Sequence, residues 1–364
     1  MIYFDNSATT KPSETAITAA RAAMEINWGN PSSVHFMGNE AARLLSSSRD
    51  AVAAAIGVRH ATGGRVVFTS GGTEADNMAL LGITYAKDRP VNNGSRGVIM
   101  ISDGEHAAIE NSAEALEKDG FTVLRVPTIG GVLDIDYIKT HATKNVILAS
   151  FMLVNNETGA VYDVRSAADA VRAASPNAVI HSDCVQALGK IRFSPTSLKV
   201  DALTVSAHKI GALKGTGALW ISDGIIKTKR ISPIVFGGGQ EENRRSGTEN
   251  TVGIAAFAAA CREAVAEFDA RAEKVTTLRE YADAALKNID GITINRPSGA
   301  YLPHIISITL PKIKSETMLN HLSSKGICIS AGSACSARSR HISRALAAFG
   351  VSLADADSTV RVSM

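Results

Sequence analysis

Lys209 stands between two predicted strands, in the stretch SAHKIGALKGTGALWI at residues 206–221. Ser206 ends the first strand, His208 and Lys209 follow it, and a glycine-rich turn leads into the second strand. A lysine held in such a place can be desolvated, so that its pKa falls and its amine becomes a nucleophile for a Schiff base. An exposed turn lysine fits the pattern equally well, so the stretch alone leaves both interpretations open.

Asp183 ends another predicted strand, in HSDCVQALGK at residues 181–190, and Gln186 follows three positions later. A carboxylate there can pair with a cationic ring nitrogen of a cofactor. His181, Asp183 and Cys184 also suggest a metal site. That hypothesis is weak, because adjacent residues of a strand point to opposite faces. We expect no metal ion here.

The stretch FTSGGTEADN at residues 68–77 contains a strand end, two glycines and the start of a helix at Thr73. Free backbone N–H groups at a helix start bind anions, and the Thr73 hydroxyl adds a donor, so the pattern is typical of a phosphate site. A tight turn with a helix cap explains it as well. It is not a P-loop, because the Gly-Lys-Ser/Thr ending is absent.

His106 precedes a predicted helix in DGEHAAIEN at residues 103–111. An imidazole at the mouth of a sheet can stack on a ring or move protons, although a lone histidine is more often a capping or surface residue. The segment VNNETG at residues 154–159 places two amides and a carboxylate after a buried strand. A plain turn explains that segment equally well.

Cys335 lies among small residues in SAGSACSARSRH at residues 330–341, followed by Arg338 and Arg340. No bulky apolar residue is present to bury the thiol. Either a solvent-facing turn happens to contain a cysteine, or Cys335 is a nucleophile. The thiolate is the reactive form, and the two arginines can favour it, dock an acidic acceptor protein or simply be solvated.

Seven short apolar runs between residues 65 and 222 predict the strands that position these residues. Several are apolar on both faces, as expected of strands covered by helices above and below. Helical patterns alternate with them, which predicts a mostly parallel sheet and the α/β class. In such sheets ligands bind outside the carboxyl ends of the strands. The predicted strands are 65–70, 97–102, 122–127, 145–150, 177–183, 201–206 and 217–222, and the predicted helices are 73–85, 107–118, 134–141 and 163–174.

The pattern changes after about residue 250. Residues 254–286 are alanine-rich with helical spacing and predict one or two long helices. A smaller α+β pattern follows, with strands at 304–310, 326–330 and 359–363 and helices at 316–325 and 343–349. We therefore predict a larger domain of residues 15–250 and a smaller one of residues 1–14 with 251–364, which carries Cys335.

Composition excludes several classes of protein. The chain has 364 residues, enough for two domains, and a net charge of +3, too small for a general nucleic-acid binder. Its four cysteines lack the spacing of a zinc site or a disulfide framework. No apolar run has the length of a membrane span, and Asp5 comes too early for a signal peptide. We expect a cytoplasmic protein with free thiols and no membrane or direct nucleic-acid partner.

Taken in order, the polar stretches supply what pyridoxal 5′-phosphate (PLP) requires. The cofactor needs an amine for its aldehyde, an acid that keeps the pyridine nitrogen protonated, and a cup for its phosphate. Lys209, Asp183 and the turn before Thr73 match these needs, and His106 matches a ring-stacking group.

Over essentially its whole length the sequence resembles the cysteine desulfurases of the NifS/IscS type, within the class V aminotransferases of PLP fold-type I. The resemblance implies a mostly parallel seven-stranded sheet between helices and a smaller α+β domain. It rests on YFDNSATT (3–10), WGNPSSVH (28–35), FTSGGTEADN, the EH pair at 105–106, VNNETG, HSDCVQALGK, SAHK, GGGQEENRRSGTEN (237–250), SAGSAC and VRVS (360–363).

The resemblance also implies a role for each matching residue. Lys209 would carry PLP and move the substrate α-proton, with Asp183 on the pyridine nitrogen, Gln186 on the phenolic oxygen and His106 stacked on the ring. Gly72, Thr73, Ser206 and His208 would bind the phosphate, together with Thr248 of a partner subunit. Asn156 would contact the cofactor and, with Arg361 as a bidentate fork, hold the substrate carboxylate.

The implied reaction converts L-cysteine to L-alanine and leaves the sulfur on Cys335 as a persulfide. The sulfur then passes to an acceptor protein for iron–sulfur clusters or another sulfur-containing product. A homodimer with shared sites is implied as well. Two alternatives stay open: a PLP-dependent selenocysteine lyase or other β-eliminating lyase, and a degenerate paralogue without activity. Cys335 favours the desulfurase, and an intact Lys209, Asp183 and His106 argue against the degenerate paralogue.

Overall fold

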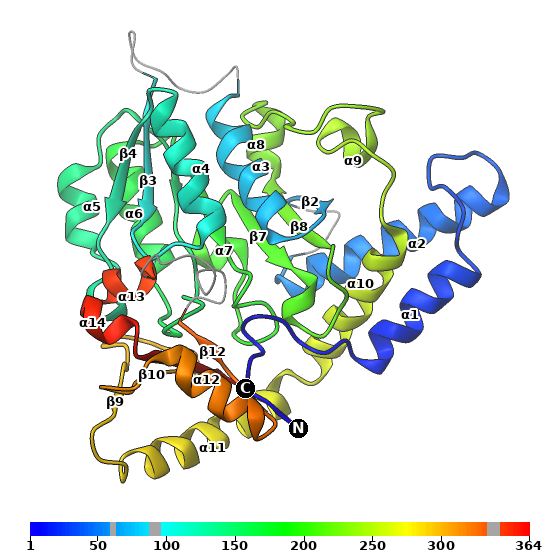
Figure 1. Ribbon diagram of the computed structural model, residues 1–364. Helices are drawn as coiled ribbons and strands as arrows, with labels where there is room; N and C mark the ends of the chain where they lie inside the picture. Colours follow the sequence, from blue (N-terminus) through cyan, green and yellow to red (C-terminus); the bar gives the residue numbers. More distant parts are fainter. Residues whose placement is uncertain (59–62, 87–95, 333–342) are drawn as a thin grey trace.

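The computed structural model describes residues 1–58, 63–86, 96–332 and 343–364. A seven-stranded sheet with helices on both faces forms the centre of its larger part (Figure 1). β8 runs antiparallel to both neighbours and the other pairs are parallel, so the predicted α/β class and mostly parallel sheet are confirmed. In sheet order the strands are β2 (Gly64–Thr69), β8 (Gly217–Ser222), β7 (Ala202–Ser206), β6 (Val179–Asp183), β5 (Val146–Ser150), β3 (Val98–Ser102) and β4 (Thr122–Val126).

The two faces of this sheet are packed separately. In β3, Ile99 and Ile101 join one buried apolar cluster, and Met100 between them joins another, because successive side chains of a strand alternate. The first cluster includes residues of α3 (Gly72–Thr84), α4 (Ala107–Lys118) and α8 (Asp223–Lys227). The second includes α5 (Ile135–His141), α6 (Val164–Ala174) and α7 (Pro195–Leu198).

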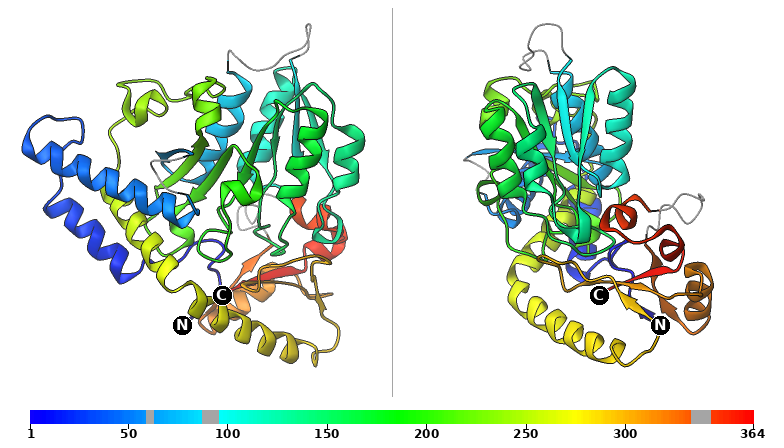
Figure 2. Two further views of the ribbon diagram at one scale, coloured as in Figure 1. Left: turned by 180° about the vertical axis from the view of Figure 1, so that it is seen from behind. Right: turned by 90° about the vertical axis from the view of Figure 1, so that its left-hand side faces the viewer.

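Two N-terminal helices form an arm beside the sheet (Figure 2), and the sequence did not predict them. They are α1 (Glu14–Glu25) and α2 (Phe36–Ala55), and both pack against α10 (Thr251–Ala266). α10 and the next helix, α11 (Phe268–Leu286), show that the region predicted as one or two long helices forms two. Large apolar side chains remain exposed on the arm: Met24, Ile26, Trp28, Val34 and Phe36.

A smaller antiparallel sheet lies beside the large one, near the two chain ends (Figure 1). Its strands in order are β12 (Ser330–Ala331), β13 (Thr359–Ser363), β10 (Ile305–Thr309) and β9 (Thr293–Ile294). The remaining helices are α9 (Gln240–Asn243), α12 (Ser315–Ser324), α13 (Arg344–Phe349) and α14 (Leu353–Ala356), with short 3-10 turns at Ile129–Gly131 and Ala207–Lys209.

The strand predicted at 326–330 is wrong as a single element. Residues Ile327–Cys328 form β11, which pairs in parallel with the N-terminal β1 (Ile2–Tyr3). Ser330–Ala331 pair instead with β13. The chain changes partners within three residues, and a pattern of apolar residues cannot show which partner each half takes.

The division into residues 15–250 and residues 1–14 with 251–364 stays a prediction. Within the described ranges, no helix combines the length and apolarity needed to cross a membrane. The same ranges contain no group of three or more His, Cys, Asp or Glu side chains that could hold a metal ion.

Candidate active site

The carboxyl ends of β6 and β7 meet at one edge of the large sheet, because these strands are parallel neighbours. Asp183 is the last residue of β6, and Lys209 lies in the 3-10 turn directly after β7. His106 follows β3 and caps α4, its Nδ1 accepting a hydrogen bond from the Ala108 amide over 3.1 Å. Three of the residues singled out in the sequence are thus brought to the same edge.

Charge interactions link these three side chains. Burial raises the pKa of the Asp183 carboxyl, and nearby His106 and Lys209 counteract that rise. Burial is also the main reason why the pKa of His106 lies below its ordinary value. A buried carboxyl group whose charge is favoured by a nearby positive charge is suited to face a protonated ring nitrogen.

The Lys209 side chain is held by the residues that precede α1. Its Nζ donates to the backbone carbonyls of Ser7, over 2.5 Å, and of Ala8, over 2.9 Å. Gln186 shares the same anchor, since its Nε2 donates to the Ser7 carbonyl over 3.0 Å. Its Oε1 accepts from Lys190 Nζ over 3.2 Å, which fixes the direction of the amide. The amine and the amide therefore converge on one point.

The start of α3 and the end of β7 form a cradle for an anion. A Cβ at Gly72 would lie 2.9 Å from Val185 Cγ2 and 3.5 Å from Ser206 Cβ, so the glycine keeps this space open. The Ser206 hydroxyl is buried and has no hydrogen-bond partner among the described residues. Thr73, the second residue of α3, is exposed. These features fit a phosphate at a helix start.

His208 stands next to this cradle as a neutral imidazole. Burial first, and then Lys209, lower its pKa to about 4. Its Nδ1 lies 3.1 Å from Thr9 Oγ1. A neutral imidazole can still donate one N–H to an anion.

Arg361 is 2% exposed and lies on β13 of the smaller sheet. Its Nη1 donates to the backbone carbonyl of Asn156 over 2.9 Å, and its Nη2 donates to Asp5 Oδ1 over 3.1 Å. Its Nε is buried without a hydrogen-bond partner in the described part of the chain. This leaves a donor for a ligand carboxylate, and the contact with Asn156 is made by the backbone rather than by the side-chain amide.

Two buried acids near Asp183 were missed in the sequence. Glu105 Oε1 accepts from Ser102 Oγ over 2.6 Å and from the Met152 amide over 2.7 Å, and burial raises its pKa to about 8. Burial and the charge of Asp183 raise the pKa of Asp76. Both acids lie inside stretches already singled out, directly before His106 and in the first turns of α3.

The remaining predicted residues are not tested by this geometry. Cys335, Arg338 and Arg340 lie outside the described residues. Thr248 is exposed, on the segment that follows α9. It belongs to the 237–250 stretch. Its role at the PLP phosphate of a partner subunit stays a prediction.

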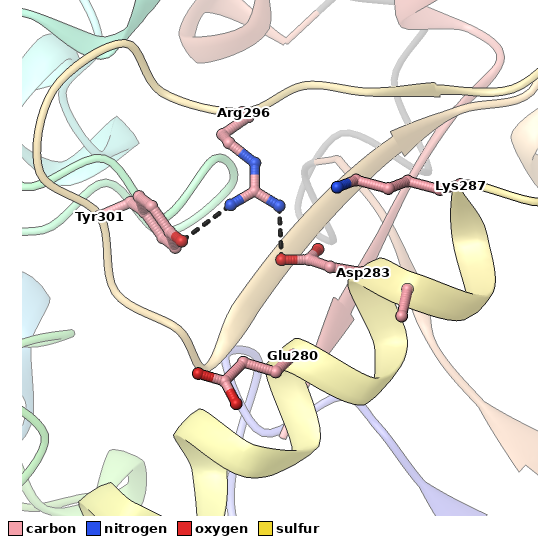
Figure 3. Close-up of a pocket in the computed structure, with 6 residues that line it drawn as sticks. Glu280, Asp283, Lys287, Arg296 and Tyr301 are labelled. Carbon is pink, nitrogen blue, oxygen red and sulfur yellow. Dashed lines mark hydrogen bonds and ion pairs between the residues drawn. The ribbon is translucent and has the colours of Figure 1, made fainter.

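A cavity of about 540 Å³ lies elsewhere, between α11 and the loop before β10 (Figure 3). Arg296 bridges Asp283 and the Tyr301 hydroxyl there, which ties the loop to the helix. Glu280, Ala284 and Lys287 complete the lining, and none of the predicted site residues belongs to it.

Comparison with known families gives a match over nearly the whole chain. The model of the family described as aminotransferase class V matches residues 2–364. Among curated relatives, "Cysteine desulfurase IscS" of Dictyoglomus turgidum is 34% identical over 365 residues, covering 100% of this chain and 89% of the relative. The "NifS/IcsS protein homolog" of Lactobacillus delbrueckii subsp. bulgaricus is 37% identical over 366 residues, covering 100% of this chain and 92% of the relative.

Solved structures agree with these relatives. A structure titled "NIFS-LIKE PROTEIN" has a TM-score of 0.89 at 32% identity, covering 100% of this chain and 93% of that one. Another, titled "SspA in complex with cysteine", has a TM-score of 0.83 at 26% identity, covering 100% and 99%.

Proposed function

The chain belongs to the class V aminotransferase family and is a cysteine desulfurase of the NifS/IscS type, and from this premise we propose which residues perform the reaction. The observation that carries the proposal is the convergence of Asp183, His106 and Lys209 at the sheet edge beside the open cradle of Gly72 and Ser206. We assign PLP to this place, since an amine, a buried acid and an anion cradle are the parts that this cofactor requires.

Each part of PLP has a counterpart in this arrangement. Lys209 would hold the aldehyde carbon, and Asp183 the pyridine nitrogen. Gln186 would donate its remaining amide N–H to the phenolic oxygen, and the His106 ring would cover the cofactor ring. Asn156 would lie beside the cofactor as well. The phosphate would be bound by Gly72, Thr73, Ser206 and His208.

PLP, when bound, withdraws electrons from the α-carbon of an amino acid attached to it. Arg361 holds the carboxylate of L-cysteine, using the Nε that has no partner among the described residues, and Asn156 lines the same place. The amine of Lys209 accepts the α-proton. Arg361 comes from the smaller sheet, and Asn156 follows a strand of the larger one. The substrate would therefore be held between the two sheets.

Cys335 would be the sulfur acceptor. As a thiolate it forms an S–S bond to the substrate sulfur while the substrate Cβ–S bond breaks, and the bonding pair stays on Cβ. A proton added to Cβ completes the methyl group of alanine, and the enzyme keeps a persulfide. An acceptor protein then takes the sulfur by attack on that persulfide.

We also propose a cytoplasmic homodimer. The large exposed apolar side chains between residues 24 and 36, where α1 leads into α2, support this, because exposed apolar groups of this kind can mark an interaction site. In the dimer, Thr248 would reach the phosphate of the partner's cofactor.

The test is incubation of the PLP-loaded protein with L-cysteine, followed by measurement of alanine and of protein-bound persulfide. Wild type should form both, whereas Cys335→Ser should form neither in the absence of a reductant. Ser at this position keeps the size and polarity but is a far poorer nucleophile than a thiolate. Equal alanine from both proteins would show that Cys335 is not the sulfur acceptor and would favour a selenocysteine lyase, whereas pyruvate and ammonia in place of alanine would favour a β-eliminating lyase. A protein that cannot be loaded with PLP would favour a degenerate paralogue.

A further inference from the structure

Three consecutive residues, five to seven positions before Thr248, have a strained backbone. Glu241, Glu242 and Asn243 have φ values of 49°, 57° and 63°, in the left-handed region that L-residues with a Cβ avoid. Such conformations persist where the surroundings determine them, and they cluster at functional sites. The question is what holds these residues and for what purpose.

The buried carboxylate of Glu241 supplies most of the restraint. It accepts hydrogen bonds from Arg49 Nη1 over 2.6 Å and Nη2 over 2.9 Å, and from the Phe68 amide over 3.1 Å. Arg49 belongs to α2 and stacks 4.8 Å from the centre of the Phe68 ring, and Phe68 belongs to β2. The strained segment is therefore fixed to the arm and to the edge of the large sheet at once.

A second tie joins the same segment to the proposed phosphate site. Arg245 donates from Nε over 2.7 Å and from Nη2 over 3.2 Å to the carboxylate of Glu74, in the first turn of α3. Glu74 also accepts from the Ser70 amide over 2.8 Å. The Gly247 amide donates to Gln240 Oε1 over 2.8 Å, which closes the segment on itself just before Thr248.

Glu242 provides a natural contrast within this segment. Its backbone is as strained as that of Glu241, yet its side chain is 64% exposed. Its carboxylate accepts from Arg244, two positions on, over 2.7 Å and lies 3.7 Å from Arg65. Exposed ion pairs of this kind contribute little. The buried ties from this segment to α2, β2 and α3 are those of Glu241 and Arg245.

We propose that Glu241 and Arg245 are positioning residues that hold residues 237–250 in one shape, so that Thr248 is presented to the PLP phosphate of a second copy of this chain. The inference rests on the homodimer and the role of Thr248 proposed above. It adds that the affinity of one subunit for PLP depends on ion pairs made inside the other subunit.

Hybrid dimers can test this, because each substitution can be placed in a chosen subunit. The reference hybrid joins a Lys209→Ala subunit, which keeps Thr248, to a Thr248→Ala subunit, which keeps Lys209. Two different affinity tags isolate it. The visible absorbance of lysine-bound PLP then reports only the site of the Lys209-bearing subunit, and a titration with PLP gives its affinity.

The reference hybrid first tests the premise alone, namely that Thr248 acts on the PLP site of the partner subunit. Its titratable site should bind PLP about tenfold more tightly than a Thr248→Ala homodimer, the change expected for one hydrogen bond to a charged group. Equal affinities would show that Thr248 does not act across the dimer. That result would overturn the premise and this inference together.

Glu241→Gln is then added to one subunit at a time. In the Lys209→Ala subunit it should weaken PLP binding at the titratable site by about tenfold, although that site lies in the other subunit. In the Thr248→Ala subunit the same change should have an effect of at most about twofold. Equal effects of the two placements would mean a general structural role and would overturn the inference.

Two further variants guard against simple misfolding. Arg245→Met breaks the second tie and is placed only in the Lys209→Ala subunit, where it should also weaken PLP binding at the titratable site, because in the other subunit it would release Glu74 beside that site itself. Glu242→Gln, the matched surface control, should leave the PLP affinity unchanged in either subunit. The melting temperature of each hybrid without PLP is measured alongside. A loss of affinity that follows the melting temperature rather than the placement would also contradict the proposal.

Discussion

Arg361 and Asn156 lie 205 positions apart in the chain, yet the guanidinium Nη1 of Arg361 donates to the backbone carbonyl of Asn156 over 2.9 Å. Arg361 comes from the smaller sheet, and Asn156 from the segment after β5 of the larger one. A second bond, from Nη2 to Asp5, fixes the plane of the guanidinium. The group that should hold the substrate carboxylate is therefore oriented before the substrate arrives.

Arg361→Lys should raise the KM for L-cysteine by about tenfold or more, because an ammonium group cannot reproduce the planar fork that binds Asn156 and Asp5 while its Nε stays free for the substrate carboxylate. Steady-state alanine formation over a range of L-cysteine concentrations measures it. The affinity for PLP should stay the same, since Arg361 is assigned to the substrate. Arg192→Lys, an exposed arginine paired with the exposed Asp269, is the control. A loss of PLP affinity without a change in KM would contradict the assignment.

Ser206→Ala should have opposite effects on the two forms of the protein. Without PLP, removal of a buried hydroxyl that has no partner among the described residues should raise the melting temperature, because the cost of desolvating it is relieved. With PLP, the affinity should fall as a phosphate contact is lost.

The matched control for this change is Ser182→Ala, on the neighbouring strand. Ser182 is buried too, but its Oγ donates to the Phe151 carbonyl over 2.7 Å. Its removal should lower the melting temperature of the PLP-free protein. If Ser206→Ala also lowers that temperature and leaves the affinity for PLP intact, Ser206 is structural.

Glu105→Gln should flatten the dependence of stability on pH. Burial raises the pKa of Glu105 from 4.5 to about 8 in the folded protein. The folded state thus binds a proton that the unfolded state has released, so the free energy of unfolding falls as pH rises between these values and the loss is complete above the higher one. Gln keeps an acceptor for Ser102 and Met152 and has no charge to bury.

Melting temperatures of the PLP-free protein at about pH 5 and about pH 9 test this prediction. The variant and wild type should be similar at the lower pH, and the variant should melt several degrees higher at the upper pH. The exposed Glu280→Gln should follow wild type at both. A variant that is less stable than wild type at the upper pH would show that the negative charge of Glu105 is needed for folding.

The central sheet could be predicted from sequence because its strands are apolar on both faces, a pattern that few other structures produce. The polar residues at strand ends could also be found, since their positions relative to the strands are visible in one dimension. The burial of Glu105 and Asp76 could not. Each is a single acid near a helix start, and it is the spatial order of the strands that places them beside Asp183.

The arm and the smaller sheet were harder to predict from the sequence, again because contacts between distant segments decide them. The helices α1 and α2 bury mainly alanines and small residues against α10, so their apolar pattern is weak. β11 is two residues long and pairs with the other end of the chain. Contacts of this kind depend on tertiary packing, and the periodicity of a short segment carries no record of them.

The four cysteines should differ sharply in reactivity, which locates the sulfur acceptor. Cys184 and Cys261 are fully buried, and burial raises the pKa of both thiols, so neither supplies a thiolate at neutral pH. Cys328 is partly exposed. In the native protein iodoacetamide should therefore leave Cys184 and Cys261 unmodified, and both should react after denaturation.

After turnover of L-cysteine, peptide mass spectrometry should find the extra sulfur atom on the peptide of Cys335. The same experiment with Cys328→Ala is the control, and it should give an unchanged yield of persulfide because Cys328 pairs with the N-terminal strand rather than with the Asp183 edge. Extra sulfur on Cys184 or Cys261 would mean that a thiol buried beneath the sheet becomes accessible during turnover. That finding would assign the transfer step to a different residue, because only a thiolate that reaches the substrate sulfur can form the new S–S bond.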